Sequence, residues 1–553
     1  MVKTKIVSSL EKIFLNDRIT RFKELRQISM LRNQRLSIQL LCTETTTPDT
    51  GSGRIWARPT IVGPLAEYAT IRTVEYIPST MPVYQDRQDV NYLSTQPGLF
   101  PDLLQPLHNR GCVPVVANQL RGVWIDFDPQ GALEGGVYPT VISLADMNGT
   151  LLTENTIEIK VLPAFLPEQE LIVTQWFHCD CLADYYRVDV FSEAHWTIIE
   201  NFIKTAVKNG QNMILTPIIT PAFDTDVGYE RPTVQLVQIA VEDGKYTFDF
   251  SLLTRWMDMC KRLGIRYFEM PPFFTQWGAT NAPKIMATVH GEYKRIFGWE
   301  TDAAGEEYGA FLSAFIPALL EFLKARGDDH LCYYHMSDEP SKDHLEQYKK
   351  SKENIKNMLS GYHAMDALSN YEFYLEGAVD TPIPATNHIT PFLEGKVENL
   401  WCYYCCGQCI DVSNRLFAMP SARTRIIGTQ MYKYNIAGFL QWGYNFYYNQ
   451  YSRDMINPYF ETTGEYFVQS GDAYSVYPAV DGTALESLRI VVFHEALEDL
   501  RAMRLCEQYY GHDKVVEEIE KVYGEVRFDK CPSRSDEMLA IRRRIDEMIE
   551  AKL

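Results

Sequence analysis

Between residues 170 and 445 the sequence alternates short apolar runs with longer amphipathic stretches, and this alternation limits the possible folds more than any other feature. Short apolar runs bounded by turn residues are typical of buried strands, and apolar repeats every three to four residues are typical of helices. Strands that alternate with helices pair in parallel, because each helix returns the chain to the start of the next strand. About eight such units match a (β/α)8 TIM-type barrel, and a doubly wound open sheet is the alternative.

The apolar runs supply the strands of the predicted barrel, and the amphipathic stretches that end near glycines supply its helices. Long loops are expected after the second and third strands. No glycine-rich phosphate-binding fingerprint follows the early strands, which disfavours a nucleotide-binding open sheet. The predicted strands cover residues 171–178, 212–217, 265–270, 331–337, 371–377, 385–390, 399–405 and 437–445. The predicted helices cover residues 192–210, 250–264, 307–327 and 342–361.

The residues on either side of this region have a different character. Residues 1–165 contain short runs of alternating polarity separated by Pro, Gly, Asp and Thr, which indicates an antiparallel β-sandwich. Two prolines near residue 165 mark the linker to a catalytic barrel at 166–505. Charged amphipathic stretches near the end predict closing helices and a C-terminal helical extension at 506–553. The predicted fold is therefore multidomain α and β.

Acidic residues outnumber basic ones, with 72 Asp and Glu against 53 Lys and Arg, so the formal net charge is −19. Such a field repels phosphate backbones, and we expect neither nucleic acid nor a membrane surface as a partner. Residues 1–18 lack the continuous apolar run of a signal peptide, and the twelve cysteines show no disulfide framework. We therefore expect a cytoplasmic protein that needs no cofactor.

The predicted strand ends carry carboxylates, amides and indoles. In a parallel barrel these ends form the active-site face, and this mixture of groups suits a carbohydrate whose hydroxyls and apolar ring face both need partners. The aromatic candidates could instead pack the barrel. Arg231 could instead brace an acid in a loop. Asp224 and Asp226 also lie in the loop after the second strand. The candidate substrate-binding residues are His178, Asp180, Arg231, Glu269, Gln276, Trp277, Trp401, Tyr403, Trp442 and Asn445.

Two adjacent acids, Asp338 and Glu339, follow the fourth predicted strand directly, and Pro340 comes next. Acids in a first turn and a proline at the first helical position are typical helix-start signals, so the pair has a purely structural explanation. A paired acid and carboxylate can also cleave a glycosidic bond. The two interpretations are compatible, because a barrel helix begins where the active site lies.

Four cysteines, Cys402, Cys405, Cys406 and Cys409, fall within eight residues. A soft-metal or iron–sulfur site is one hypothesis. Neighbouring side chains of a strand point to opposite faces, so one tetrahedral site would need an abrupt turn, and no second cysteine pair stands at ribbon-like spacing. We therefore predict packing and no metal.

Several separated motifs together resemble glycoside hydrolase family 123. The resemblance extends from about residue 170 to 505 and implies a β-sandwich followed by a (β/α)8 barrel with exo-acting β-N-acetylgalactosaminidase activity. The motifs are "QWFHCDCLADYY", "TPAFDTDVGYERPTVQL", "FFTQWGA", "RIFGWET", "HMSDEP", "GFLQWGYNFYY" and "GDAYSVYPAVDGTALESLR".

The resemblance implies that Asp338 and Glu339 are the catalytic pair of a substrate-assisted, retaining mechanism. The acetamido oxygen of the substrate attacks the anomeric carbon and forms an oxazolinium ion. Asp338 would orient the acetamido group, and Glu339 would protonate the leaving oxygen and then deprotonate water. Because no protein nucleophile is needed, the two acids can be neighbours. The closeness of the two carboxyl groups also raises one pKa.

The sequence thus predicts an enzyme that hydrolyses an oligosaccharide or glycoconjugate by releasing a terminal β-linked N-acetylhexosamine, with GalNAc preferred. Two alternatives stay open. One is a retaining glycosidase of other specificity on the same scaffold. The other is a non-catalytic glycan-binding protein, which would not require the intact acid pair.

Overall fold

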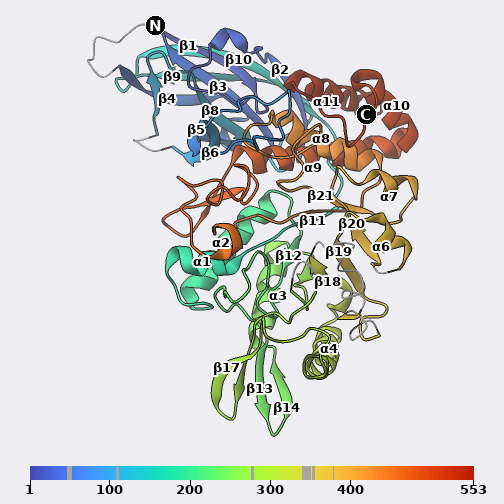
Figure 1. Cartoon of the computed structure of the whole chain (residues 1–553). Helices are drawn as coiled ribbons and strands as arrows, with labels where there is room; N and C mark the ends of the chain where they lie inside the picture. The colour runs from blue at the N-terminus through green and yellow to red at the C-terminus, as the bar shows by residue number, and fades with distance from the viewer. Residues whose placement is uncertain are drawn as a thin grey trace.

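The computed structural model describes residues 1–45, 53–107, 111–275, 279–336, 350–351, 355, 357–377 and 379–553, and the backbone of 337–338. N-terminal β-sheets lie at one end of the molecule, beside the C-terminal helices, and a parallel barrel with its helices lies next to them (Figure 1). Both chain ends are on the sandwich side, far from the tips of two long hairpins at the opposite end (Figure 1).

The N-terminal part is a sandwich of two five-stranded sheets. Among the described residues of this part, all strand pairs are antiparallel except β10 with β2, which is parallel. The inner faces enclose their own apolar core, which includes Ile38, Ile125 and Ile142, all fully buried. The first sheet contains, in spatial order, β1 (Val2–Ser8), β3 (Leu36–Glu44), β8 (Arg121–Phe127), β5 (Ala69–Ser79) and β6 (Gly98–Pro106). The second contains β2 (Gln27–Leu31), β10 (Leu151–Leu162), β9 (Gly136–Ala145), β4 (Arg54–Val62) and β7 (Val113–Val116).

The central sheet has eight parallel strands. Followed around the barrel, from β11 through β20 and on to β21 and β22, they come in the order of the chain. Its ends almost meet: Tyr403 donates its backbone N–H to the Pro384 carbonyl (3.1 Å), and its own carbonyl accepts from Thr386 (2.9 Å). The sheet is therefore a nearly closed barrel whose interior is packed with apolar side chains. The strands are β11 (Ile172–Gln175), β12 (Met213–Leu215), β15 (Tyr267–Met270), β18 (Cys332–Asp338), β19 (His363–Ala367), β20 (Thr381–Ile383), β21 (Trp401–Tyr403) and β22 (Gly438–Gln441).

Helices follow the barrel strands, and three of the predicted ones are confirmed. Ser192 begins α2 by accepting the His195 N–H on its side chain, and Gly264 and Gly327 end α3 and α4 in the left-handed region. Most of the predicted helix at 342–361 lies outside the described residues; residues 350, 351 and 355 are helical, and 357–361 form a turn. The barrel helices are α1 (Cys179–Tyr186), α2 (Glu193–Lys208), α3 (Ser251–Leu263), α4 (Glu306–Arg326), α6 (Tyr371–Leu375), α7 (Thr390–Glu394), α8 (Ser421–Lys433) and α9 (Leu488–Tyr510).

Two predicted strands are wrong. Residues 371–375 form helix α6, because the Asn370 side chain accepts the Glu372 N–H and caps a helical turn in a segment whose polarity alternates like a strand. The actual strands are β19 and β20, and the second of these ends at Ile383, before the predicted 385–390. Both are short, so they carry little periodic signal.

The two predicted long loops instead contain hairpins, β13–β14 (Gln238–Glu242 and Lys245–Asp249) and β16–β17 (Ile285–Val289 and Glu292–Phe297). Each turns through two residues at positive φ: Asp243 (50°) and Gly244 (74°), then His290 (49°) and Gly291 (84°). Positive φ at both central positions is the geometry of tight hairpin turns. The hairpins form one four-stranded sheet that projects from the barrel (Figure 1).

Within the described part of the chain, α4 alone is long and apolar enough to cross a membrane by length and composition. Its fully buried residues include Phe311 and Phe315, and Phe315 packs against Phe248 of β14. Acids open the helix and Lys324 and Arg326 close it, as the helix dipole favours. These contacts are those of a core helix.

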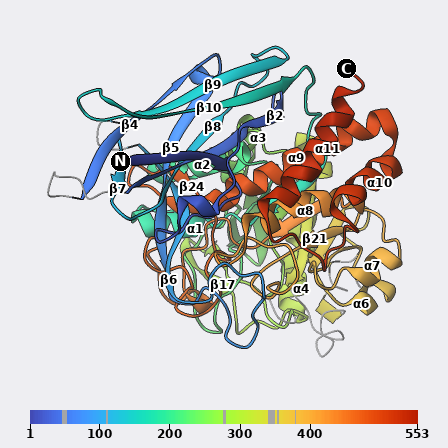
Figure 2. The ribbon, with the colours of Figure 1, turned by 90° about the horizontal axis from the view of Figure 1, so that it is seen from above.

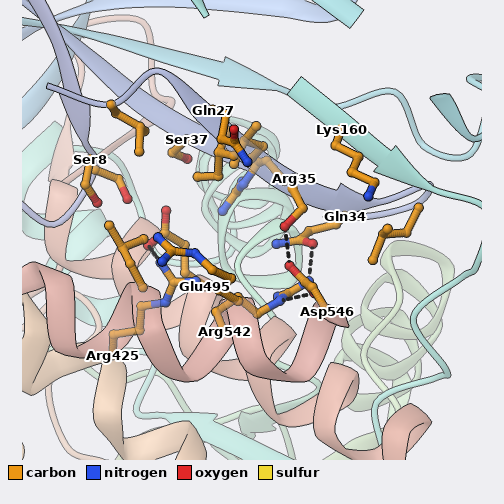
Figure 3. Close-up of a pocket in the computed structure, with 18 of the residues that line it drawn as sticks. Ser8, Gln27, Gln34, Arg35, Ser37, Lys160, Arg425, Glu495, Arg542 and Asp546 are labelled. Carbon is orange, nitrogen blue, oxygen red and sulfur yellow. Dashed lines mark hydrogen bonds and ion pairs between the residues drawn. The ribbon is translucent and has the colours of Figure 1, made fainter. Parts of the chain in front are cut away.

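The C-terminal helices α9 and α11 (Ser535–Glu550) pack beside α8 and against the sandwich, and α10 (His512–Tyr523) packs on α9 and α11 (Figure 2). A polar cavity of about 310 Å³ lies at this junction (Figure 3). Arg542 of α11 donates to Asp546 (2.8 Å) and Gln34 (2.6 Å), and Asp546 accepts from Ser29 of β2 (2.6 Å). Side chains from both parts of the chain thus satisfy each other, as in an interdomain contact.

Candidate active site

A cavity of about 230 Å³ opens at the carboxyl ends of the barrel strands. Residues that follow β11, β12, β21 and β22 line it, together with Ala367 at the end of β19. Its walls are mostly aromatic, and Trp176 stacks on Phe223 with ring centroids 3.8 Å apart. A concave site with apolar walls and a few polar groups at this barrel face is the arrangement expected of an active site.

Asp338 ends β18 at the rim of this cavity. Its backbone pairs with Ala367, which lines the cavity. The side chain of Asp338 lies outside the described atoms, and Glu339, Gln276 and Trp277 lie outside the described residues. Their predicted roles stay predictions.

His178, Asp180 and Arg231 lie together in one buried group. Arg231 donates to both Asp180 oxygens, from Nε (2.6 Å) and Nη2 (2.8 Å), and its Nη2 lies 3.1 Å from His178 Nδ1. Burial and then the Arg231 charge lower the pKa of His178 to about 3, so the imidazole is neutral at physiological pH. Of the three, His178 lines the cavity. Arg231 therefore braces Asp180, an acid in the first turn of α1.

Asn445 is fully buried and holds the backbone of His178 from both sides. Its Oδ1 accepts the His178 N–H (2.9 Å), and its Nδ2 donates to the His178 carbonyl (3.0 Å). These reciprocal bonds fix the end of β11 to the segment after β22. Asn445 does not itself line the cavity, so the structure places it behind the wall.

Glu269 lies fully buried beneath the cavity floor. Its carboxylate accepts hydrogen bonds from Trp176 Nε1 (2.8 Å) and Thr174 Oγ1 (2.7 Å), and His335 Nδ1 lies 3.2 Å away. Trp176 forms part of the cavity wall, so Glu269 orients that indole from below. The structure separates Glu269 from the cavity by one side chain.

The remaining aromatic candidates divide between the two ends of the barrel. Tyr403 and Trp442 line the cavity at the carboxyl end. Trp401, at the amino end of β21, faces a different cavity at the opposite end of the barrel. Its ring lies against Gly438, where a Cβ would approach within 2.1 Å. Trp401 therefore packs the barrel, which is the alternative role considered for these aromatics.

Comparison with known proteins decides the family. The family model described as the glycoside hydrolase 123 catalytic domain matches residues 176–506. The chain belongs to glycoside hydrolase family 123. The chain is accordingly a glycoside hydrolase, and its substrate is a carbohydrate. No curated protein matches the sequence.

One solved structure supports the fold of this family 123 member. A family 123 glycoside hydrolase from Clostridium perfringens, studied for glycolipid glycan hydrolysis, is similar at 16% identity and a TM-score of 0.73, over 100% of this chain and 97% of that one. A β-glucuronidase from Parabacteroides merdae aligns at 11% identity over 91% of this chain and 51% of that one, with a TM-score of 0.30. A likeness of that size has no bearing on the fold.

Sequence reasoning missed several residues that line the cavity of this family 123 enzyme. Cys405 and Cys406 are half-buried there, whereas Cys402 and Cys409 are buried away from it. In the described part of the chain, no three His, Cys, Asp or Glu side chains converge as metal ligands would. The cluster thus divides between the wall and its packing: Cys402 lies in β21, whereas Cys405 and Cys406 follow that strand and line the cavity.

A second missed feature is the strained contact between Asp224 and Tyr451. Both line the cavity at positive φ (40° and 64°), and Asp224 Oδ2 accepts the Tyr451 N–H (3.0 Å). Burial raises the pKa of Asp224 to about 6. Non-glycine residues at positive φ gather at functional sites, where surrounding structure holds them. Such strain has no signature in the sequence, although the aspartate-rich loop after β12 pointed to this region.

Proposed function

We propose that this family 123 enzyme is a retaining exo-glycosidase that releases terminal β-linked N-acetylhexosamine, GalNAc in preference to GlcNAc. The observation that supports the proposal is the pairing of Asp338 with cavity-lining Ala367, which brings the backbone of Asp338 to the rim of a sugar-sized cavity. A cavity of about 230 Å³ is below the usual range for ligand sites, roughly 300–1,000 Å³, and suits one terminal sugar. We also assign the barrel to the (β/α)8 class.

In the proposed mechanism the substrate supplies the nucleophile. The acetamido carbonyl oxygen attacks the anomeric carbon, the glycosidic bond breaks, and Glu339 gives its proton to the leaving oxygen. Asp338 holds the acetamido N–H and stabilises the positive charge of the oxazolinium ion. Glu339 then removes a proton from water as the water oxygen attacks the anomeric carbon. This attack opens the oxazolinium ring and gives the product with net retention of configuration. The acid and the base are thus the same residue in two successive steps.

The aromatic walls support a sugar as the occupant. Trp176, Tyr403 and Trp442 offer ring faces and edges to the apolar side of a pyranose, and Asp224 offers a carboxylate to its hydroxyls. Burial keeps these polar groups out of bulk water, which strengthens each hydrogen bond they make to a ligand. The glycolipid glycans hydrolysed by the Clostridium perfringens relative are one natural class of substrate to test.

The test is a panel of aryl β-glycosides of GalNAc, GlcNAc and galactose, with the first-formed anomer followed by NMR. We expect fastest hydrolysis of the GalNAc glycoside, a β-configured first product, and strong inhibition by a thiazoline mimic of the oxazolinium ion. Hydrolysis of acetamido sugars without thiazoline inhibition would indicate a protein nucleophile and contradict the mechanism. Fastest hydrolysis of a sugar without an acetamido group would favour a glycosidase of other specificity.

We further propose a reducing compartment, the cytoplasm, as the site of action. All twelve cysteines are among the described residues, and none forms a disulfide. Disulfides are rare in cytosolic proteins because cellular reductants keep thiols reduced. Fractionation of cells followed by immunoblotting tests this, and recovery of the protein outside the cytoplasm would contradict it.

A further inference from the structure

A short segment after β22, residues 471–474, lies directly behind the cavity wall, and we call it the clamp. Asp472 at its centre is fully buried and does not line the cavity. Its Oδ2 accepts hydrogen bonds from Trp442 Nε1 (2.9 Å) and from the Cys406 N–H (3.0 Å). Both donors belong to residues that line the cavity, one after β22 and one after β21. A single carboxylate oxygen therefore joins two sections of the wall.

The main chain of the clamp is pressed against the end of β22. A Cβ at Gly443, next to Trp442, would lie 2.2 Å from the Ala473 carbonyl oxygen, so only glycine permits this approach. Gly471 is at φ 104°, and a Cβ there would lie 2.9 Å from the Phe417 nitrogen. The clamp thus has little room to shift without moving the wall.

The clamp is held in turn by a buried arginine. Arg489 of α9 donates from Nη1 to the carbonyls of Gly471 and Tyr474, each at 2.8 Å, and so grips the clamp at both ends. The rest of its guanidinium pairs with Asp102 of β6, through Nε (2.7 Å) and Nη2 (2.9 Å). Asp102 and Arg489 are both fully buried. The sandwich therefore supplies the anion that orients the arginine.

We propose that Asp472 is a positioning residue for the sugar site, and that the sandwich acts on the site through Asp102, Arg489 and the clamp. The inference rests on the proposed function, because it takes the cavity to be the sugar site. The hydrogen bond from Trp442 to Asp472 fixes the orientation of the indole ring that the sugar is proposed to contact. Without this hydrogen bond the indole can rotate. The sandwich is thus part of the active-site scaffold.

The first test is a double-mutant cycle with Asp472→Ala and Trp442→Phe. Asp472→Ala is expected to raise KM about 10-fold with a smaller fall in kcat, because the wall is misplaced while the acid pair is intact. In the Trp442→Phe background the same change is expected to raise KM less than about 3-fold, since its main partner is already missing. An equal effect in both backgrounds would overturn the inference.

The second readout does not depend on catalysis. The difference in fluorescence between the native enzyme and Trp442→Phe isolates the Trp442 signal from the other eight tryptophans of the nine. In Asp472→Ala this signal is expected to shift to the red and to become more open to acrylamide quenching. An unchanged Trp442 signal would overturn the positioning role even in an active enzyme. A changed signal in a protein that hydrolyses no acetamido sugar would instead count against the proposed function alone.

The third arm tests the link to the sandwich with Asp102→Asn, which keeps one acceptor for Arg489. It is expected to alter the Trp442 signal and to raise KM about 3-fold or more, in the same direction as Asp472→Ala. Its matched control is Asp546→Asn at the junction shown in Figure 3, another buried interdomain carboxylate that touches neither the clamp nor the cavity proposed to hold the sugar. The control is expected to lower thermal stability and leave KM unchanged. Equal changes in KM for both variants would reduce the link to general destabilisation and overturn it.

Discussion

Asp338 at the end of β18 lies in register with Ala367 at the end of β19. Neighbouring strands are about 4.8 Å apart, so the backbone of the first proposed catalytic residue is one strand spacing from a residue that lines the cavity. The acid pair therefore begins where β18 ends, at the barrel face that carries active sites. This register is the link between the fold and the chemistry proposed for it.

Replacement of Glu339 tests its role as the proton donor. Glu339→Gln is expected to lower kcat about 10²–10⁴-fold on an aryl β-GalNAc with a weakly acidic phenol, because that leaving oxygen needs a proton. The loss should be much smaller with a strongly acidic phenol, which leaves unassisted. Asp338→Asn is the matched comparison and should slow both substrates alike. Equal losses for Glu339→Gln on both phenols would contradict the assignment.

Glu269 is expected to govern stability and the placement of Trp176. Glu269→Gln puts an amide N–H₂ among the donors of Trp176, Thr174 and His335, so one buried donor loses its acceptor. We expect a loss of about 2–4 kcal/mol in the free energy of unfolding, measured by denaturant titration. Direct binding of the sugar by Glu269 would instead appear as a large rise in KM with stability unchanged.

The thiols of Cys405 and Cys406 should report occupancy of the cavity. Both are half-buried and line it, so brief treatment with iodoacetamide followed by peptide mapping should modify them before the buried Cys402. A bound thiazoline inhibitor should protect both. Cys531, half-buried elsewhere in the chain, is the internal control, although burial raises the pKa of its thiol to about 12 and slows it. Protection of Cys531 to the same degree would show that the inhibitor acts by general stabilisation.

Glu495 at the interdomain junction makes stability depend on pH. Its Oε2 accepts from Arg425 Nη1 (3.1 Å), but burial raises the pKa of its carboxyl to about 7, above the ordinary 4.5. The folded protein therefore binds more protons than the unfolded one between these values, and this group's contribution to stability falls as pH rises through that window.

Glu495→Gln removes this dependence, because the amide resembles the protonated acid. The free energy of unfolding of the variant should equal that of the native protein near pH 4. It should then exceed the native value increasingly up to pH 8, by at most about 3 kcal/mol. Asp224 and Asp472, whose pKa values burial raises to about 6, are present in both proteins and cancel. Parallel unfolding curves at all pH values would contradict the role given to Glu495.

The barrel was readable from the sequence where its strands are flanked by long amphipathic helices, as α2, α3 and α4 are. The periodic signal failed at β19 and β20, whose helices α6 and α7 have only five residues each. The hairpin β13–β14 carried a local signal in Asp243–Gly244, a dipeptide typical of tight turns. The prediction of a long loop between strand and helix does not include that signal.

The site shows a different limit. Position at a strand end predicts the barrel face on which a residue lies. His178, Tyr403 and Trp442, predicted in this way, do line the cavity. Position does not predict which way a side chain points. Asn445 stands at a strand end as predicted, but it lies behind the cavity wall and does not line the cavity. Nor does it predict partners: Arg231 and Asp180 are 51 residues apart and pair only once the loop after β12 meets the start of α1. Such pairings depend on the folded geometry.

The pairing of Asp102 with Arg489 also constrains how the chain is made. The two residues are 387 positions apart, so at about 5–20 residues per second the ribosome releases the arginine roughly 20–80 s after the aspartate. Throughout that interval the nascent sandwich holds a carboxylate destined for a dry interior with no cation to meet it, and burial of an unpaired charge is costly. The face of β6 that carries Asp102 is therefore expected to stay open to water until α9 arrives, so the contact between the sandwich and the C-terminal part forms last.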